Sequence, residues 1–289
     1  MIYALITFIC WGTADLFYKK GNIDKSNYNE LKTALFVGLV MGIHATIYLI
    51  INHLRINIYE LIKYLPVSLC YITSMVISYK GLRYMELSLA SPIENTSGVI
   101  TSLLLIIFFK EKLPTLAYFG MLFVLIGIVM LSILEKKENR RVKLKKINML
   151  IIIFPLLYCF LDGLGTFLDA IYLDKLSLIS EDSSLICYEY TFFIYAIIMY
   201  IFLKTKKIKI SLTKEKNKII ASILETAGQF FYVFAMSNDS TIAATIVGSY
   251  CILSLILSHI FLREKLTDQK YIALIIALAG LFILTILNI

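Results

Sequence analysis

Apolar residues dominate the chain in runs of 18 or more residues that recur about every 28 residues. A helix built from such a run is long enough to cross a hydrocarbon core of about 30 Å. Strands of a membrane barrel are much shorter, about 9 to 11 residues. The pattern therefore predicts an all-α membrane protein with ten transmembrane helices. They cover residues 2–20, 31–52, 61–84, 87–109, 115–134, 148–173, 182–203, 217–236, 240–262 and 270–288.

The composition supports this class of protein. Of the 289 residues, 59% are apolar and 17% are charged, whereas a soluble domain holds about 45 to 50% and 25%. This excludes a soluble enzyme. The net charge is +8, but Lys and Arg concentrate in the short connections, so we expect no nucleic-acid partner. All five cysteines lie inside predicted helices without metal-ligand spacing, so we expect neither a metal nor a cofactor.

The connections between the predicted helices differ in charge on the two sides of the membrane. Those that follow odd-numbered helices hold 23 Lys or Arg residues, and the opposite side holds 5. By the positive-inside rule, the odd-numbered connections are cytoplasmic. We expect the protein in the cell membrane, that is, a plasma or inner membrane. Ten crossings then place both termini on the side opposite the cytoplasm.

The two halves of the chain repeat each other. The run FKEKLPTLAYFGMLFVLIG (Phe109–Gly127) aligns with LREKLTDQKYIALIIALAG (Leu262–Gly280) at an offset of 153 residues, which also pairs Tyr79 with Tyr232. Five helices are an odd number, so the second copy crosses in the reverse direction, as an inverted repeat related by a pseudo-two-fold axis in the membrane plane. We expect a first repeat at 1–134, a basic cytoplasmic linker at 135–147 and a second, inverted repeat at 148–289.

Two further features point to a known family. The chain opens with WGTADLFYKK (Trp11–Lys20), and the tags FKEKL and LREKL close the fourth and ninth predicted helices. With ten helices, the chain resembles the drug/metabolite transporter superfamily, EamA type, over essentially its whole length. The resemblance implies a secondary transporter. Members of that family move amino acids, sugars, nucleotide sugars, choline and toxic cations, so membership does not name the substrate.

Ionisable residues inside the predicted helices are candidates for the site. Each costs about 2.5 to 3.5 kcal/mol near a helix centre, so each needs a partner or a purpose. Most are acidic, and none of the deep ones is Lys or Arg. They are His44, Glu94, Asp162, Glu189 and Glu225, with Asp15 nearer a helix end. Any one of these carboxylates could instead make a structural hydrogen bond to a neighbouring helix.

Helical spacing places aromatic and amide side chains on the same faces as these groups. The additional candidates are Trp11 with Asp15, Tyr158 with Asp162, Gln229 and Tyr232 with Glu225, Tyr48 with His44, and Tyr79 through the repeat. Helix 1 matches helix 6 in two registers. An offset of 147 sets Asp15 opposite Asp162, and an offset of 151 sets Trp11 opposite Asp162 and Gly12 opposite Gly163.

Some of these residues have alternative roles. Asp15 and Lys19 are spaced as an i, i+4 pair that would order the end of helix 1. His44 titrates near neutral pH when free, but a neutral core histidine fits the same position. Pro92 before Glu94 and Pro155 before Asp162 predict breaks that free backbone carbonyls. Gly38 and Gly42 form a GxxxG pattern that favours close helix packing, inside the chain or between two copies.

Carboxylates and aromatic faces together suit a small organic cation, such as a quaternary ammonium compound, a polyamine or a basic metabolite. A buried carboxyl group can exchange its proton for such a cation, which predicts proton-coupled transport by alternating access with a midplane site. Asp162 and Glu225 are the leading candidates for this exchange. The alternative is an exporter of amino acids or other zwitterionic or neutral metabolites.

An intramembrane enzyme is disfavoured, because the chain contains no GxGD, HExxH or GxSxG pattern. The expected partners are a small, cationic substrate, protons and the lipid bilayer. Ten helices with both repeats in one chain suffice for a monomer or a weak dimer.

Overall fold

The computed structural model describes residues 2–23, 27–84, 87–110, 112–141, 149–264 and 267–286. Its regular elements within these ranges are helical. They are α1 (Ile2–Asn22), α2 (Asn29–Ile51), α3 (Ile58–Gly81), α4 (Leu87–Glu94), α5 (Thr96–Phe109), α6 (Thr115–Arg141), α7 (Met149–Ala170), α8 (Glu181–Thr205), α9 (Lys216–Gly248), α10 (Cys251–Leu257) and α11 (Asp268–Ile286), with π-helical turns η1 (Ile171–Lys175) and η2 (Ser258–Leu262) extending α7 and α10.

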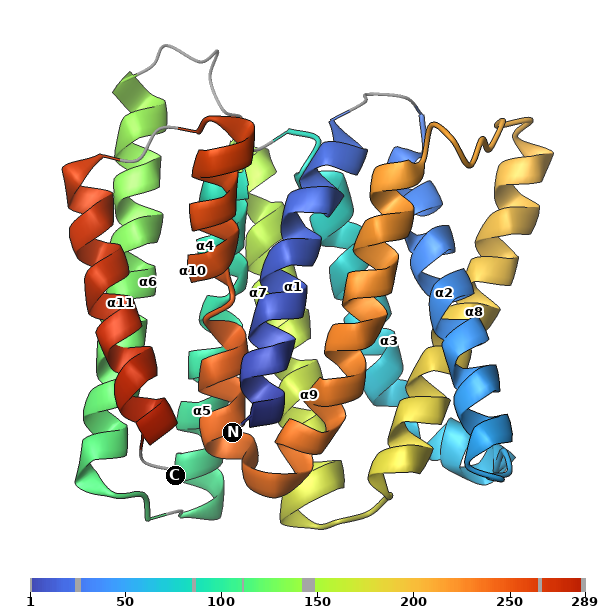
Figure 1. The fold of residues 1–289 in the computed structure, drawn as a ribbon, viewed down its shortest axis with the longest axis horizontal. Helices are drawn as coiled ribbons and strands as arrows, with labels where there is room; N and C mark the ends of the chain where they lie inside the picture. Colours follow the sequence, from blue (N-terminus) through green and yellow to red (C-terminus); the bar gives the residue numbers. More distant parts are fainter. Residues whose placement is uncertain are drawn as a thin grey trace.

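The helices stand side by side and run up and down in alternation (Figure 1). We call the end at which α1 begins the lower end, and the end at which it finishes the upper end, as they are drawn in Figure 1. The first turn of α1 and the last turn of α11 both lie at the lower end (Figure 1). The first described helix therefore begins on the same side of the bundle on which the last one ends.

Each predicted span is largely helical over its described residues, but most boundaries differ by a few residues, and the span 87–109 is divided between α4 and α5. The helix predicted to end at 134 continues to Arg141 as α6, and the rest of the predicted linker, 142–147, lies outside the described residues, as do Glu111, Lys265 and Leu266 of the repeated tags. α9 carries the span 217–236 and the start of the next span. Asp239 leaves the helical conformation (φ −157°, ψ 87°), and the chain turns back upward there (Figure 1).

Five helices in the described ranges are long and apolar enough to cross a membrane: Asn29–Ile51, Ile58–Gly81, Ile153–Lys175, Glu181–Thr205 and Lys216–Leu262. The last of these contains the reversal at Asp239. Thr96–Phe109 and Thr115–Leu131 are apolar but shorter. Many large apolar side chains on the five long helices are exposed, such as Ile50, Phe160 and Ile201. This is expected for helices that face lipid rather than water.

Helices from the two halves of the chain pair across the molecule. The main pairs are α1 with α9, α3 with α7, α2 with α8, α6 with α11, α5 with α9, α2 with α9 and α3 with α8. Small residues let these pairs approach closely. A Cβ atom at Gly38 of α2 would lie 2.2 Å from the carbonyl oxygen of Phe192 in α8, and one at Gly42 would meet the ring of Phe193 at 2.3 Å. The GxxxG pattern of α2 therefore serves packing inside the chain.

Candidate functional site

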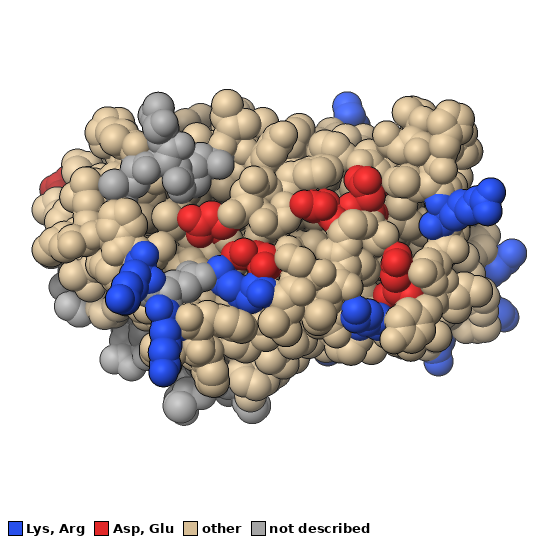
Figure 2. All heavy atoms as spheres, turned by 90° about the horizontal axis from the view of Figure 1, so that it is seen from below, with Lys and Arg blue, Asp and Glu red and all other residues tan. Residues whose placement is uncertain are grey.

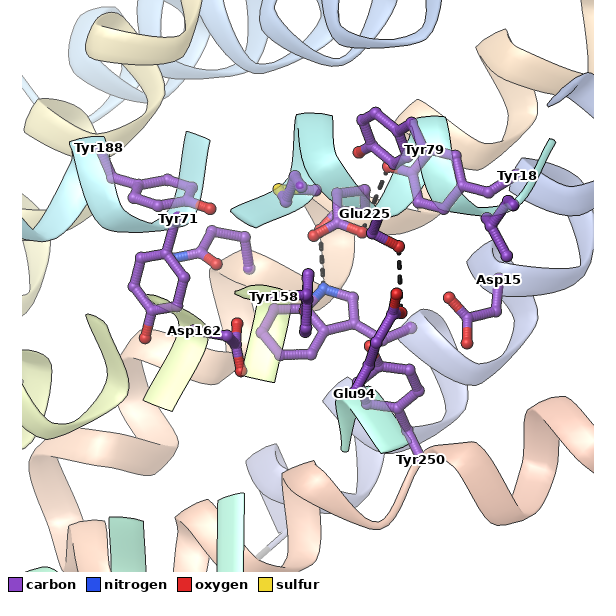
Figure 3. Close-up of a pocket in the computed structure, with 15 residues that line it drawn as sticks. Asp15, Tyr18, Tyr71, Tyr79, Glu94, Tyr158, Asp162, Tyr188, Glu225 and Tyr250 are labelled. Carbon is purple, nitrogen blue, oxygen red and sulfur yellow. Dashed lines mark hydrogen bonds between the residues drawn. The ribbon is translucent and has the colours of Figure 1, made fainter. Parts of the chain in front are cut away.

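A small cavity of about 40 Å³, space for a few water molecules, lies in the interior of the bundle, between α1, α3, α4, α7, α8 and α9. Figure 3 shows its lining residues. They are Trp11, Asp15, Tyr18, Tyr71, Met75, Ser78, Tyr79, Leu82, Glu94, Tyr158, Asp162, Tyr188, Glu225, Gln229 and Tyr250. Four of these residues are acidic and none is Lys, Arg or His.

Asp15 is held by one hydroxyl from each half of the chain. Its Oδ2 atom accepts hydrogen bonds from Ser91 Oγ of α4 at 2.9 Å and from Ser254 Oγ of α10 at 2.8 Å. Lys19, one turn further along α1, points its Nζ atom at the carbonyl oxygen of Leu82, 3.0 Å away. Asp15 therefore faces the cavity, while Lys19 joins α1 to the end of α3.

Glu94 and Asp162 are each held by a serine of a neighbouring helix. Ser78 Oγ donates to Glu94 Oε2 at 3.0 Å, and Ser97 Oγ donates to Asp162 Oδ2 at 2.7 Å. Glu94 is only 5% exposed, and its other oxygen, Oε1, is buried without a hydrogen-bond partner among the described residues. A buried carboxylate oxygen without a donor is costly, so Oε1 is a candidate acceptor for a cation or a proton.

Glu225 occupies the upper part of the cavity, beside Tyr18 and Tyr79 (Figure 3). The phenol of Tyr18 donates to Glu225 Oε2 at 3.3 Å, and the indole Nε1 of Trp11 donates to the backbone carbonyl of Glu225 at 3.2 Å. Both contacts join α1 to α9. One turn later on α9, Gln229 also lines the cavity, and its buried Nε2 atom has no hydrogen-bond partner within the described part of the chain.

Aromatic rings surround the four carboxylates. The Trp11 ring lies 5.2 Å from that of Tyr232 and 5.9 Å from that of Tyr250, centre to centre. Tyr18 and Tyr79 lie 4.7 Å apart. Tyr232 lines a second cavity of about 30 Å³, which shares Trp11 and Asp162 with the first. The π-faces of such rings attract cations.

Two helix breaks border these cavities. α4 ends at Glu94 and α5 begins at Thr96, within the segment where the sequence predicts a break. In the second half, Ser249 and Tyr250 separate α9 from α10. The broken helices cross where a Cβ atom at Gly98 would lie 2.8 Å from the Cα of Gly248. The break predicted at Pro155 is wrong, because α7 continues unbroken around that residue.

Three of the predicted site residues lie away from the cavity, between α2, α8 and α9. His44 Nδ1 lies 2.9 Å and 2.8 Å from the two carboxylate oxygens of Glu189, which is fully buried. Tyr48 donates to Asp182 Oδ1 at 2.6 Å, and Phe230 packs against the rings of both His44 and Tyr48. The structure thus brings these three residues together as a separate cluster, and none of them lines the cavity.

Sequence reasoning missed Asp169 of α7, which is fully buried. Its Oδ1 atom accepts a hydrogen bond from Tyr64, and its Oδ2 atom accepts one from Tyr71 at 3.2 Å. Tyr71 lines both cavities and also contacts Thr166 Oγ1 at 3.1 Å. Asp169 follows Asp162 by seven residues, so helical spacing alone places the two on one face. This spacing could have identified Asp169 as a candidate residue from the sequence.

No group of three His, Cys, Asp or Glu residues among the described ones is arranged to hold a metal ion. The cavity therefore offers hydrogen-bond acceptors, negative charge and aromatic faces to an organic ligand. It is lined by residues from both halves of the chain.

Comparisons with known proteins agree with this architecture. The model of the EamA-like transporter family matches residues 1–133 and again residues 149–286. A search of the curated proteins finds no match. A solved crystal structure of a protein superposes with a TM-score of 0.70 at 12% sequence identity, over 99% of this chain and 96% of its own. This likeness shows a shared fold. The chain is therefore a multi-pass membrane protein that belongs to the EamA-like transporter family, and it is a transporter rather than an enzyme.

Proposed function

We propose that this transporter carries a small organic cation, such as a quaternary ammonium compound, a polyamine or a basic metabolite, in exchange for protons. The observation that carries the proposal is the charge of the cavity. Its lining holds Asp15, Glu94, Asp162 and Glu225 among aromatic rings, with no basic residue among its described members. Such a site attracts cations and repels anions.

The state of Glu94 supports this choice of charge. A buried carboxylate without a counter-charge is expensive, and the unpartnered Oε1 atom of Glu94 adds to that cost. Binding of a cation or a proton would offset this free-energy cost. A zwitterionic substrate would bring its own carboxylate next to these four side chains, and the cavity lining offers that group no basic partner.

Proton coupling follows from competition for the same groups. A carboxyl group binds either a proton or an organic cation, so one displaces the other when both share a site. Asp162 and Glu225 are suited to this exchange because they stand on different helices, α7 and α9, and both line the cavity (Figure 3). Protons that arrive from one side of the membrane would release the cation to that side.

The helix pairing supports ten crossings and two inverted repeats. When the two halves are exchanged, the pair α1 with α9 becomes the pair α7 with α3, and the pair α2 with α9 becomes the pair α8 with α3. The pairs α2 with α8, α5 with α9 and α6 with α11 each map onto themselves. The contacts of two glycines favour the register of 151 residues. A Cβ atom at Gly12 would lie 3.0 Å from the carbonyl oxygen of Tyr250, and one at the equivalent Gly163 would lie 3.6 Å from Ser97 Cβ. Ser97 and Tyr250 are themselves equivalent positions of the two halves at the offset of 153 residues.

This arrangement supports alternating access at a site between the repeats. The charge asymmetry of the sequence favours an orientation with the upper end in the cytoplasm and both termini outside. Figure 2 views the lower end and shows Asp and Glu toward the middle of that face, with Lys and Arg mostly nearer its edges. The site is complete within one chain, which is consistent with a functional monomer.

Thermal stabilisation of the purified protein tests the proposal. A ligand at one hundred times its dissociation constant stabilises the folded state by about 2.7 kcal/mol. We expect quaternary ammonium compounds and amines to raise the melting temperature. Neutral isosteres, in which carbon replaces the charged nitrogen, should not. Lowering the pH should weaken the effect, because protons compete for the carboxylates.

Single substitutions provide the controls. Asp162→Asn and Glu225→Gln should abolish stabilisation by cations and cation-driven proton movement in proteoliposomes. Glu189→Gln alters a fully buried carboxylate that lies outside the cavity, so this variant should keep both the stabilisation by cations and the proton movement. If neutral or zwitterionic solutes stabilise the protein as well as cations do, the site serves the export of such metabolites and the cation proposal is wrong.

A further inference from the structure

The lower end of the cavity is sealed by a cluster of phenols around one acid. Asp169 of α7 accepts hydrogen bonds from Tyr64 and Tyr71 of α3. The phenol oxygen of Tyr71 lies 2.8 Å from that of Tyr232 of α9. At most 6% of any of these side chains is exposed. We call these four residues the lower cluster. It ties together three helices from both halves of the chain.

A second cluster seals the upper end. Tyr18 of α1 donates to Glu225 of α9, and its ring packs on that of Tyr79 of α3. Tyr18, Tyr79 and Glu225, which are at most 7% exposed, form the upper cluster. Just above it, Lys19 Nζ holds the carbonyl oxygen of Leu82 at 3.0 Å. The cavity therefore lies between two layers of side chains.

The two clusters occupy equivalent places in the two halves. The offset of 151 residues carries Tyr18 to Asp169, and the offset of 153 carries Tyr79 to Tyr232. On α3, the position equivalent to Glu225 is Ile72, next to Tyr71. A phenol meets a carboxylate at both ends, but the roles of the helices are swapped. α1 supplies the phenol at the upper end, whereas α7 supplies the acid at the lower end.

We propose that these clusters are the two closures of the transport cavity and that Asp169 is the positioning residue of the lower one. Hydrogen bonds between phenols and a carboxylate are stronger than those between neutral groups, so each cluster holds its three helices together until it is broken. Glu225 belongs to the cavity as well as to the upper cluster. A cation bound there competes with Tyr18, which couples occupancy of the cavity to opening at the upper end.

Asp169 acts differently, because it does not line the cavity. It holds Tyr71, and Tyr71 lines both cavities. Loss of its hydrogen bonds would free Tyr71 to swing away and let α7 part from α3 at the lower end. The two closures rest on the alternating access proposed above and do not depend on the charge of the substrate, whereas the coupling through Glu225 also rests on the proposed cation.

Labelling of a single cysteine from each side of the membrane tests the closures. Met75, which lines the cavity, is replaced by Cys in a chain whose five native cysteines are replaced by Ala or Ser. A membrane-impermeant methanethiosulfonate is then applied to vesicles of either orientation. The ratio of labelling rates from the two faces cancels the affinity of the reagent for the cavity. No substrate is needed, so the result stands even if the substrate is not a cation.

Asp169→Asn and Tyr64→Phe should each raise the labelling rate from the lower face, and Tyr18→Phe should raise it from the upper face. The loss of one hydrogen bond predicts a change of roughly 2- to 10-fold. Tyr48→Phe removes a phenol–carboxylate bond between α2 and α8 and should change neither rate. Equal acceleration from both faces, or unchanged rates in folded Tyr64→Phe and Tyr18→Phe proteins, would overturn the proposal.

Discussion

Alanine at Gly98 should destabilise the protein, because the two broken helices cross there without room for a side chain. The new Cβ atom would lie 2.4 Å from the carbonyl oxygen of Ala244 and 2.8 Å from the Cα of Gly248. Both atoms are backbone, so no rotamer change relieves the overlap. Carbon atoms prefer a separation of about 3.5 to 4.0 Å, so the helices must part by roughly 1 Å.

That displacement also strains hydrogen bonds at the same crossing. Ser102 Oγ donates to the carbonyl oxygen of Thr241 at 2.6 Å and accepts from Thr245 at 2.8 Å. Overpacking of an interior typically costs about 1 to 3 kcal/mol, and we expect Gly98→Ala to reach the upper part of this range. The melting temperature of the purified protein should fall by several degrees.

Gly163→Ala is the matched control. It makes the same chemical change inside α7, but its Cβ would meet Ser97 Cβ at 3.6 Å and Thr101 Oγ1 at 3.7 Å, which are ordinary contacts. Alanine is favoured over glycine in a helix by up to about 1 kcal/mol, so this variant should melt at or above the temperature of the parent. The reasoning fails if Gly98→Ala is as stable as Gly163→Ala.

Two other buried polar groups give further predictions. Tyr64→Phe removes one donor from Asp169 and should lower the free energy of unfolding by about 1 to 3 kcal/mol, measured by thermal melting; an unchanged melting temperature would contradict the buried hydrogen bond. Glu215→Gln should cost about 3 to 5 kcal/mol, because Glu215 pairs with both Lys32 and Lys218 and all three are buried. Limited proteolysis at the upper end should then be faster, and equal rates would show that solvent already screens these charges.

Much of the architecture could be predicted because the bilayer imposes it on the sequence. The backbone N–H and C=O groups of a long apolar run can form all their hydrogen bonds within the run only if it is a helix. The repeat of the two halves is visible in the sequence at an offset of 153 residues. The four acids of the cavity could be nominated because a charge within an apolar run is expensive wherever it points. A site between two inverted repeats is built from both halves of the chain, and this is why acids from both halves could be expected to share one cavity.

The rotation of each helix about its axis could not be read from the sequence. α8 is apolar on all sides, so its pattern does not say whether Glu189 faces the cavity or α2. The structure pairs it with His44 instead. Asp169 escaped notice because it lies four residues before the predicted end of its span at 173, where an acid is expected to reach water. It is buried because Tyr64 and Tyr71 of α3 cover it.

The crossing of Gly98 with Gly248 has a mechanical consequence. Two helices that meet backbone to backbone have no interlocking side chains at that point, so the contact can act as a fulcrum. From Gly98 to Phe109, α5 extends 11 residues, a lever of about 16 Å at 1.5 Å per residue. A tilt of about 10° would move the far end of that lever by roughly 3 Å, about the width of a water molecule, while the atoms at the fulcrum stay almost still.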